Sequence, residues 1–400
     1  MTDYSDMQFQ FGDRRLVGQE QTREQISRIV RSGRISHAYL FSGPPGVGKT
    51  AFALAFAELL NGVDHLTDLG GQAFSRKSSW FTHPDVHVFL PVPTGVSVEE
   101  LRARLELLRD DPYEVVDFSL RPSLSDTEDT SNKQAFYPIR YFREEIRPMA
   151  FFKPNEGRKT VIVLTDVENM RTEAANAFLK LLEEPNEKVI FLLTTRNTEA
   201  LLPTVISRCQ HLQLRPLKTA EIEEALIRND GLPEEEARYL ARVSGGNYAM
   251  TRFFDAETLK ETRASIVTYL RDSYTQDAVA LTRTAQNWQS ERNREGQLAL
   301  LNVLEVFLRD LMVYRDTGRK SLVTNADQID VIGRFCETMP EARLEEMIAE
   351  VGRCKPMVLQ NVQSKYIFTV LALRFSWMMR GKDPAIASNE PWRHLPAYSA

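Results

Sequence analysis

The apolar positions in the first half of the chain follow two alternating patterns. Continuous apolar runs, which are typical of strands buried on both faces of a parallel sheet, occupy residues 37–41, 86–90, 161–164 and 189–193. Between them, residues 21–31 and 173–184 are expected to be helices, and residues 50–60 are apolar all round, as in a buried helix. Because strands and helices alternate, the pattern predicts an α/β domain with a doubly wound parallel sheet.

The strand-like runs stop after residue 216. Only helical spacing follows, first in a short segment that ends at the turn-forming residues 244–247 and then over the rest of the chain. The pattern therefore predicts three domains: an α/β domain over residues 1–216, a small helical domain over 217–255, and an all-helical domain over 256–400.

The last helical region carries an apolar stripe. Its members are Val358, Ile367, Val370, Leu371 and Leu373. A stripe of this kind is either ordinary core or a surface on which other chains assemble. The sequence alone leaves both interpretations open.

One stretch of the first domain, about 92–135, lacks both patterns and is expected to be an insertion. Within it, residues 99–109 have the spacing of an exposed charged helix. Residues 119–134 are rich in Ser, Thr, Asp and Asn, a composition typical of a mobile surface segment. We expect the acidic part, residues 117–130, to be a solvated loop without chemistry.

Composition narrows the class of protein. The 400 residues are 42% hydrophobic and 26% charged, which is typical of a globular protein, and the net charge of -5 does not favour nucleic-acid binding by the chain as a whole. Scattered basic residues give only a weak indication of a DNA-facing patch; they are Lys180, Lys188, Arg196 and Arg215. The three cysteines are far apart, and no apolar run suits a signal peptide or a membrane span. We therefore expect a cytoplasmic protein with free thiols.

One segment matches a phosphate-binding motif completely. It reads Gly43-Pro44-Pro45-Gly46-Val47-Gly48-Lys49-Thr50. Its glycines allow backbone N–H groups to surround phosphate oxygens, and the expected helix after it adds an N-terminal dipole. Lys49 can reach the β- and γ-phosphates, and the Thr50 hydroxyl can reach Mg²⁺. Because a strand is expected before it and a helix after it, the segment predicts binding of ATP or ADP with Mg²⁺, rather than a simple turn.

Three further segments resemble the AAA+ subunits of bacterial sliding-clamp loaders. Residues 36–43 resemble the approach to their P-loop, residues 174–185 their signature helix, and residues 191–209 their sensor-1 strand, which ends here in Ser207-Arg208-Cys209. His83-Pro84-Asp85 also recurs in the delta-prime branch of that family. The resemblance covers roughly the whole chain, and the motifs occur in the family's order.

The resemblance implies a fold, a function and partners. The fold is an AAA+ P-loop domain, a small helical lid and a helical C-terminal collar. The function is that of a delta-prime-like subunit of the DNA polymerase III clamp loader, which binds ATP and helps to load the sliding clamp onto primed DNA. The implied partners are the other loader subunits in a hetero-oligomer, the sliding clamp and primer–template DNA, with no membrane.

The sequence departs from the family's motor subunits at two places. Where the motors carry an Asp-Glu pair before the signature helix, this chain has Thr165 and Asp166, so that Asp166 belongs to a degenerate Walker B motif. Where they carry a sensor-2 arginine, it has Ala249, and the nearby Arg252 is out of register. Both departures favour a delta-prime subunit whose own ATPase activity is weak or depends on its partners.

The zinc module that is common in delta-prime subunits is not expected here. Residues 61–81 contain no cysteine, whereas a structural zinc needs about four closely spaced Cys or His ligands. His65, His83 and His87 are too few and too scattered to form such a site. The sequence therefore predicts no zinc.

Two further residues take roles from the resemblance. Arg208 matches an arginine finger, which is presented to a neighbour's γ-phosphate, although a surface arginine that pairs locally is the simpler alternative. Thr195 matches the sensor-1 position, where its hydroxyl would sense the γ-phosphate, or it is only a β-branched strand residue. A gamma-type motor, a non-hydrolysing structural stator and an unrelated AAA+ remodelling ATPase remain the alternative functions.

Overall fold

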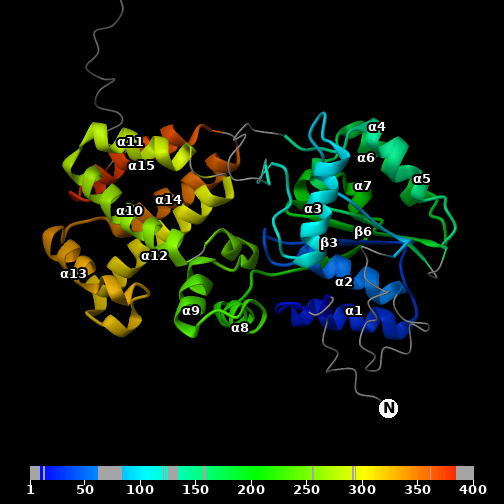
Figure 1. Cartoon of the computed structure of the whole chain (residues 1–400), viewed down its shortest axis with the longest axis horizontal. Coiled ribbons are helices and arrows are strands. Elements are labelled where there is room, and N and C mark those ends of the chain that lie inside the picture. The colour runs from blue at the N-terminus through cyan, green and yellow to red at the C-terminus, as the bar shows by residue number, and fades with distance from the viewer. Residues whose placement is uncertain are drawn as a thin grey trace, which may run out of the picture. The chain divides into compact units, whose positions relative to one another are not determined.

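The computed structural model divides the chain into two compact units (Figure 1). The first comprises residues 1–241 and 245–252, and the second comprises residues 242–244 and 253–400. The structure describes residues 10–11, 14–61, 83–119, 121, 123–124, 134–155, 159–254, 256–290, 292, 294–360 and 362–383. No helix in these ranges is long and apolar enough to cross a membrane.

A five-stranded sheet forms the centre of the first unit. In spatial order its strands are β4 (Val86–Phe89), β5 (Thr160–Leu164), β6 (Val189–Thr195), β3 (Ala38–Ser42) and β7 (Gln210–Gln213). Every neighbouring pair is parallel. All residues of β3, β5 and β6 are buried, which explains their continuous apolar runs. The predicted parallel α/β fold is confirmed.

Helices cover both faces of this sheet. Side chains alternate along β3, so that Ala38 and Leu40 belong to one apolar cluster with α6 (Thr172–Glu183). Tyr39 points to the other face and contacts Phe56 of α2 (Lys49–Asn61), with ring centroids 5.1 Å apart. The helix α1 (Glu20–Ser32) lies beside β7.

The strand β7 was not predicted, for a clear reason. Only Leu212 of its four residues is buried, and the rest are exposed at the edge of the sheet. A single inward side chain gives neither a continuous run nor an alternation long enough to detect. The strand is fixed instead by its parallel pairing with β3.

The insertion is folded against the first unit where the structure describes it. Its helix α3 (Val98–Asp110) confirms the predicted helix, but the expected exposure is wrong for Arg104, which is completely buried. The Arg104 guanidinium lies 3.7 Å from the centroid of the Phe118 ring and donates to the carbonyl oxygen of Val116 at 2.8 Å. The buried arginine thus holds residues 116–118 against α3.

Short elements connect these parts of the first unit. Before the sheet lie β1 (Gln10–Phe11) and β2 (Arg14–Arg15), which pair antiparallel. Between the sheet strands lie α4 (Ile139–Tyr141), a π-helical turn (Phe142–Ile146), α5 (Arg147–Met149) and α7 (Pro203–Ile206). After β7 come α8 (Thr219–Asp230), α9 (Glu234–Val243) and a 3₁₀ helix (Tyr248–Phe253), most of which belong to the first unit. The expected separate lid domain stays a prediction.

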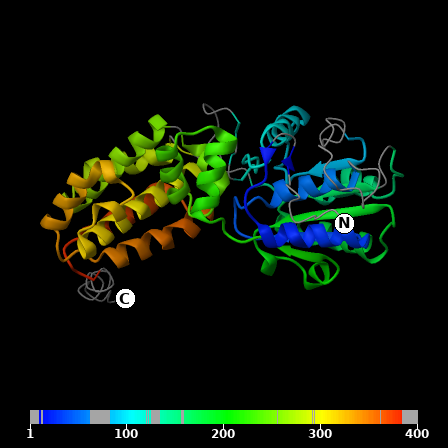
Figure 2. The same cartoon turned by 90° about the horizontal axis from the view of Figure 1, so that it is seen from below.

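In the residues that the structure describes, all regular secondary structure of the second unit is helical. Its α-helices are α10 (Ala256–Thr275), α11 (Ala278–Ser290), α12 (Arg294–Thr317), α13 (Ile329–Thr338), α14 (Leu344–Leu359) and α15 (Ser364–Met378). Figure 2 shows α12, in yellow, lying alongside α14, in orange, and the two helices contact each other along their length. α15 packs against α10, α11 and α14, so it lies in the core of the unit and connects these three helices.

Candidate nucleotide-binding site

The P-loop joins β3 to α2, as its sequence predicts. Gly46 and Gly48 have φ angles of 68° and 99°, which lie in the left-handed region that favours glycine. A Cβ atom on Gly46 would lie 1.5 Å from Oδ1 of Asn247, and one on Gly48 would lie 2.9 Å from the ring of Tyr113. Both glycines are therefore required by backbone conformation and by close neighbours, in addition to any ligand.

Lys49 is placed to hold an anion at this loop. Its side chain is buried, and its Nζ donates to the carbonyl oxygens of Gly43 at 2.9 Å and Pro44 at 2.6 Å. An ammonium group has three N–H donors, so one remains for a phosphate oxygen. Burial lowers the pKa of Lys49 to about 8, although the negative charges of Asp166 and Glu168 oppose the shift. An adjacent phosphate would favour the charged form, so the loop fits a phosphate group.

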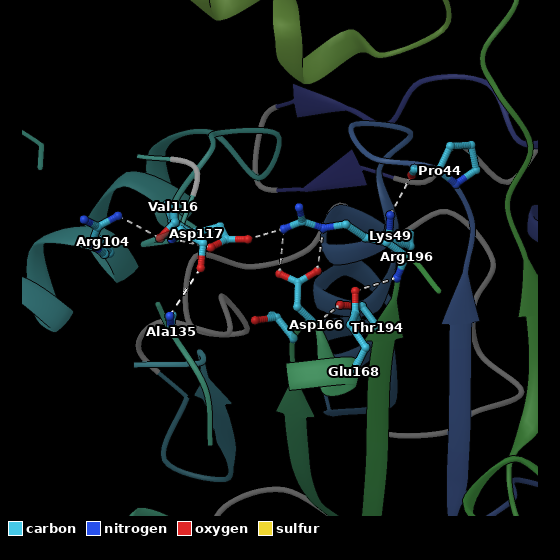
Figure 3. A network of polar contacts seen from close by, with 12 residues as sticks. Pro44, Lys49, Arg104, Val116, Asp117, Ala135, Asp166, Glu168, Thr194 and Arg196 are labelled. Atoms are coloured by element: carbon cyan, nitrogen blue, oxygen red, sulfur yellow. Dashed lines mark hydrogen bonds and ion pairs between the residues drawn. The ribbon is translucent and has the colours of Figure 1, made fainter. Parts of the chain in front are cut away.

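The carboxylate of Asp166 is paired with an arginine (Figure 3). Nε of Arg196 lies 3.1 Å from Oδ1 of Asp166, and Nη2 lies 3.3 Å from Oδ2. The same Nη2 also donates to Oδ2 of Asp117. Although burial opposes it, the charges of Asp166 and Asp117 raise the pKa of Arg196 well above its ordinary value. The guanidinium is therefore a permanent cation between two carboxylates.

The backbone around Asp166 fixes that arrangement. Asp166 follows β5 with a φ angle of 46°, a left-handed conformation that aspartate tolerates better than most residues. Its N–H donates to Oγ1 of Thr194 at 2.9 Å, and the N–H of Arg196 donates to Oε1 of Glu168 at 3.0 Å. Burial, followed by the charge of Asp166, raises the pKa of Glu168. The ends of β5 and β6 are thus linked by both backbone and side-chain contacts.

The carboxylate of Asp166 is not free to hold a Mg²⁺ ion. Mg²⁺ requires close to octahedral coordination by oxygen atoms, usually including a carboxylate. Both oxygens of Asp166 already accept from Arg196, and the guanidinium would repel a second cation. The preceding Thr165 has a neutral hydroxyl and no carboxylate. Thr50, which is partly exposed on the first turn of α2, remains the candidate metal contact of the P-loop.

The two sensor positions have local partners. The hydroxyl of Thr195 donates to the carbonyl oxygen of Asn197 at 3.1 Å and accepts from its N–H at 3.2 Å, and the Thr195 side chain is fully buried. The N–H of Ala249 donates to the carbonyl oxygen of Gly46 at 3.4 Å. Arg252 pairs instead with Asp111 of the insertion, at 2.9 Å. The segment after α9 therefore contacts the P-loop through its backbone and through Asn247, as noted above.

Arg208 lies at the surface, two residues after the end of α7. Its Nη2 lies 3.0 Å from Oε1 of Glu183 on α6, and its Nη1 donates to the carbonyl oxygen of Thr204 at 2.9 Å. The side chain of Arg208 is 34% exposed and that of Glu183 is 51% exposed. An ion pair this accessible to water contributes only about 0–1 kcal/mol, so the guanidinium can exchange this carboxylate for another anion at little cost.

Sequence reasoning missed two residues of the insertion that reach the site. The Tyr113 hydroxyl accepts from the N–H of Val17 at 2.8 Å while its ring covers Gly48. The prediction that residues 117–130 are a solvated loop without chemistry is wrong for Asp117, whose side chain is 9% exposed and pairs with Arg196. Neither residue has a sequence signal, because both act through contacts distant along the chain.

Two of the basic residues that the sequence suggested for a DNA-facing patch are paired with carboxylates. Arg196 and Arg215 are both in ion pairs, Arg215 with Glu221 and Glu20, so they do not form a free basic patch.

The zinc prediction concerns residues 61–81, of which 62–81 lie outside the described residues.

Two family models match the chain one after the other. The model described as DNA polymerase III, delta subunit matches residues 18–118 and 122–218, and the model of the C-terminal part of the delta subunit matches residues 257–376. The chain belongs to the family of DNA polymerase III clamp-loader subunits. This confirms the resemblance found in the sequence.

Individual relatives agree with the family. The chain is similar to the DNA polymerase III subunit delta' of Bacillus subtilis, with 25% identity over 350 residues that cover 86% of this chain and 92% of the relative. It is similar to subunit gamma/tau of Mycobacterium tuberculosis, with 29% identity over 64% of this chain, and to subunit tau of Escherichia coli, with 30% identity over 58%. The chain spans only 38% and 30% of the length of those two relatives.

Proposed function

We propose that the chain is a delta-prime-like subunit that binds ATP or ADP in its P-loop and helps a clamp loader to place a sliding clamp on primed DNA. The observation that carries the proposal is the match to a delta' relative over 86% of this chain and 92% of that protein, which includes both compact units. The other loader subunits, the clamp and primer–template DNA are the proposed partners. The family's multi-subunit complex supports a hetero-oligomer.

The site favours a subunit that binds nucleotide and hydrolyses it poorly. The P-loop and Lys49 fit phosphate, whereas hydrolysis needs a carboxylate-held metal and an oriented water. Asp166 is bound to Arg196, and Ala249 supplies no cation. A stator that holds nucleotide therefore agrees better with the geometry than a gamma-type motor does, although the gamma/tau relatives share the P-loop region.

Arg208 supports a second part of the proposal, which is that the chain acts on a neighbour's nucleotide. The arginine is the middle residue of the Ser207-Arg208-Cys209 motif, lies on the surface, and is held by an accessible ion pair with Glu183 and a hydrogen bond to the carbonyl oxygen of Thr204. A guanidinium is permanently charged and can bind a phosphate with two N–H donors. The chain would thus donate a cation in trans while its own site stays inactive.

Nucleotide binding is expected to depend on Lys49 and on pH. Replacing Lys49 by alanine removes a charge-assisted hydrogen bond and should weaken the affinity for ADP by about tenfold to a hundredfold. Because Lys49 has a pKa of about 8 without an anion and a higher pKa beside phosphate, binding takes up a proton above pH 8. The affinity of the natural chain should be constant below pH 8 and fall above it, by up to about tenfold per pH unit.

Titration with a fluorescent ADP analogue between pH 7 and pH 10 measures both effects. Lys49→Ala should lose the decline above pH 8 that the natural chain shows. A matched control is Lys218→Ala, which changes an exposed lysine outside the P-loop. Equal affinities of the natural chain and Lys49→Ala would contradict nucleotide binding through this loop.

A further inference from the structure

The guanidinium of Arg196 lies where three elements of the first unit meet (Figure 3). Arg196 follows β6, Asp166 follows the neighbouring strand β5, and Asp117 comes from the insertion. Because β5 and β6 are parallel neighbours, their carboxyl ends lie at the same edge of the sheet, beside the P-loop that follows β3. In an α/β sheet this edge is the place where a nucleotide binds.

Asp117 is held in position independently of Arg196. Its Oδ1 accepts from the N–H of Ser119 at 2.7 Å, while Oδ2 receives the guanidinium. The preceding Val116 is held by the fully buried Arg104. The insertion is therefore built to present one carboxylate to Arg196, which a solvated acidic loop would not do.

Two cations and three carboxyl groups gather at this edge. Arg196 and Lys49 supply the positive charges, and Asp166 and Asp117 supply two carboxylates. Burial, followed by the charge of Asp166, raises the pKa of the third carboxyl group, Glu168, which favours its neutral form. The Arg196 contacts described above use its Nε and Nη2 atoms, and a guanidinium has five N–H donors in all. Donors thus remain that can face a phosphate oxygen.

We propose that Arg196 is a built-in cation at the nucleotide site, held by Asp166 and Asp117, which makes nucleotide binding by this chain independent of Mg²⁺. The proposal rests on the proposed binding of ATP or ADP at the P-loop and adds its regulation: the ligand is a nucleoside diphosphate or triphosphate without an obligatory divalent ion. It also gives the insertion a function, because Asp117 is a second carboxylate that holds the guanidinium in place.

The first test compares the affinity of the full chain for a fluorescent ADP analogue in excess Mg²⁺ and in EDTA. The natural chain should bind equally in both, within about twofold, because the cation is covalently part of the protein. Arg196→Gln should bind more weakly in EDTA than the natural chain and recover affinity in Mg²⁺, since Asp166 is released. A tenfold or larger loss of affinity by the natural chain in EDTA would overturn the proposal.

A second test needs no nucleotide and so separates this proposal from the proposed function. In Arg196→Gln the carboxylates of Asp166 and Asp117 lose their shared cation, so the melting temperature should fall and Mg²⁺ or Mn²⁺ should raise it again. The melting temperature of the natural chain should not change with either ion. A rise in the natural chain similar to that in Arg196→Gln would show that the site takes a metal and would overturn the proposal.

Two further variants keep the test decisive. Arg196→Lys retains a positive charge, so its nucleotide binding should stay independent of Mg²⁺. This variant can be tested even where Arg196→Gln fails to fold. Arg140→Gln removes an arginine that pairs with Glu144 on the surface and should behave as the natural chain does in both tests. If the natural chain binds no nucleotide at all, the proposed function fails, whereas the melting experiment still decides whether Arg196 takes the place of a metal.

Discussion

Replacing Arg208 by alanine is expected to slow ATP turnover by the reconstituted clamp loader. At the site that receives this arginine, the rate should fall by about 10³-fold or more where the chemical step limits turnover. The affinity of this chain for its own nucleotide should stay unchanged. The reason is that Arg208 contacts Glu183 and Thr204 at the surface and is absent from the contacts that hold the P-loop. DNA-stimulated ATPase activity of the assembled complex measures the effect.

Two variants make this result specific. Arg228→Ala removes another surface arginine from an accessible ion pair, with Glu224, and should leave turnover unchanged. Asp166→Ala should also change turnover little, because Asp166 is engaged by Arg196 and does not serve a metal. If Asp166→Ala abolished turnover while Arg208→Ala did not, this chain would itself be the motor.

Replacing exposed apolar residues of α15 by aspartate is expected to prevent assembly with the other loader subunits. The helix carries a stripe of exposed apolar side chains at helical spacing, namely Tyr366, Val370, Leu373 and Trp377. Val370 and Leu373 are 49% and 51% exposed. Burying an aliphatic side chain contributes about 1.5–3 kcal/mol, so Val370→Asp combined with Leu373→Asp should weaken assembly by at least about a hundredfold. Co-elution of the chain with the other loader subunits is the measurement.

The variant should fail in assembly without failing to fold. Both side chains face solvent in the second unit, so the melting temperature of the isolated chain should change little. Val279→Asp on α11 is the matched control, because Val279 is 71% exposed but lies outside the stripe. Normal co-elution of the α15 variant would exclude this face as the assembly surface.

The C-terminal stripe shows what apolar spacing alone can and cannot predict. Of the five residues that the sequence groups together, Val358, Ile367 and Leu371 are buried in the core of the second unit, whereas Val370 and Leu373 are exposed. Helical spacing identifies apolar faces, but α15 is apolar nearly all round, and only its neighbours α10, α11 and α14 decide which face is covered. The division into core and surface therefore required the structure.

The candidate site also has parts that the sequence predicts and parts that only the structure reveals. The P-loop was predictable because its chemistry lies in eight consecutive residues between a strand and a helix. The pairing of Arg196 with Asp166 was not, since the two residues are far apart in sequence and meet only because β5 and β6 are neighbours. Asp117 was less predictable still, because an acidic residue in a stretch without periodicity looks solvated until its partner is known.

The central claim, that this chain works as a clamp-loader subunit, is tested most directly by purifying the tagged full-length chain from its own cells and identifying the proteins that remain bound. The account predicts that other DNA polymerase III clamp-loader subunits are recovered with it. It also predicts that they are lost when Val370 and Leu373 are both replaced by aspartate. Recovery of only unrelated proteins, with no subunit of the clamp loader or polymerase, would contradict the account.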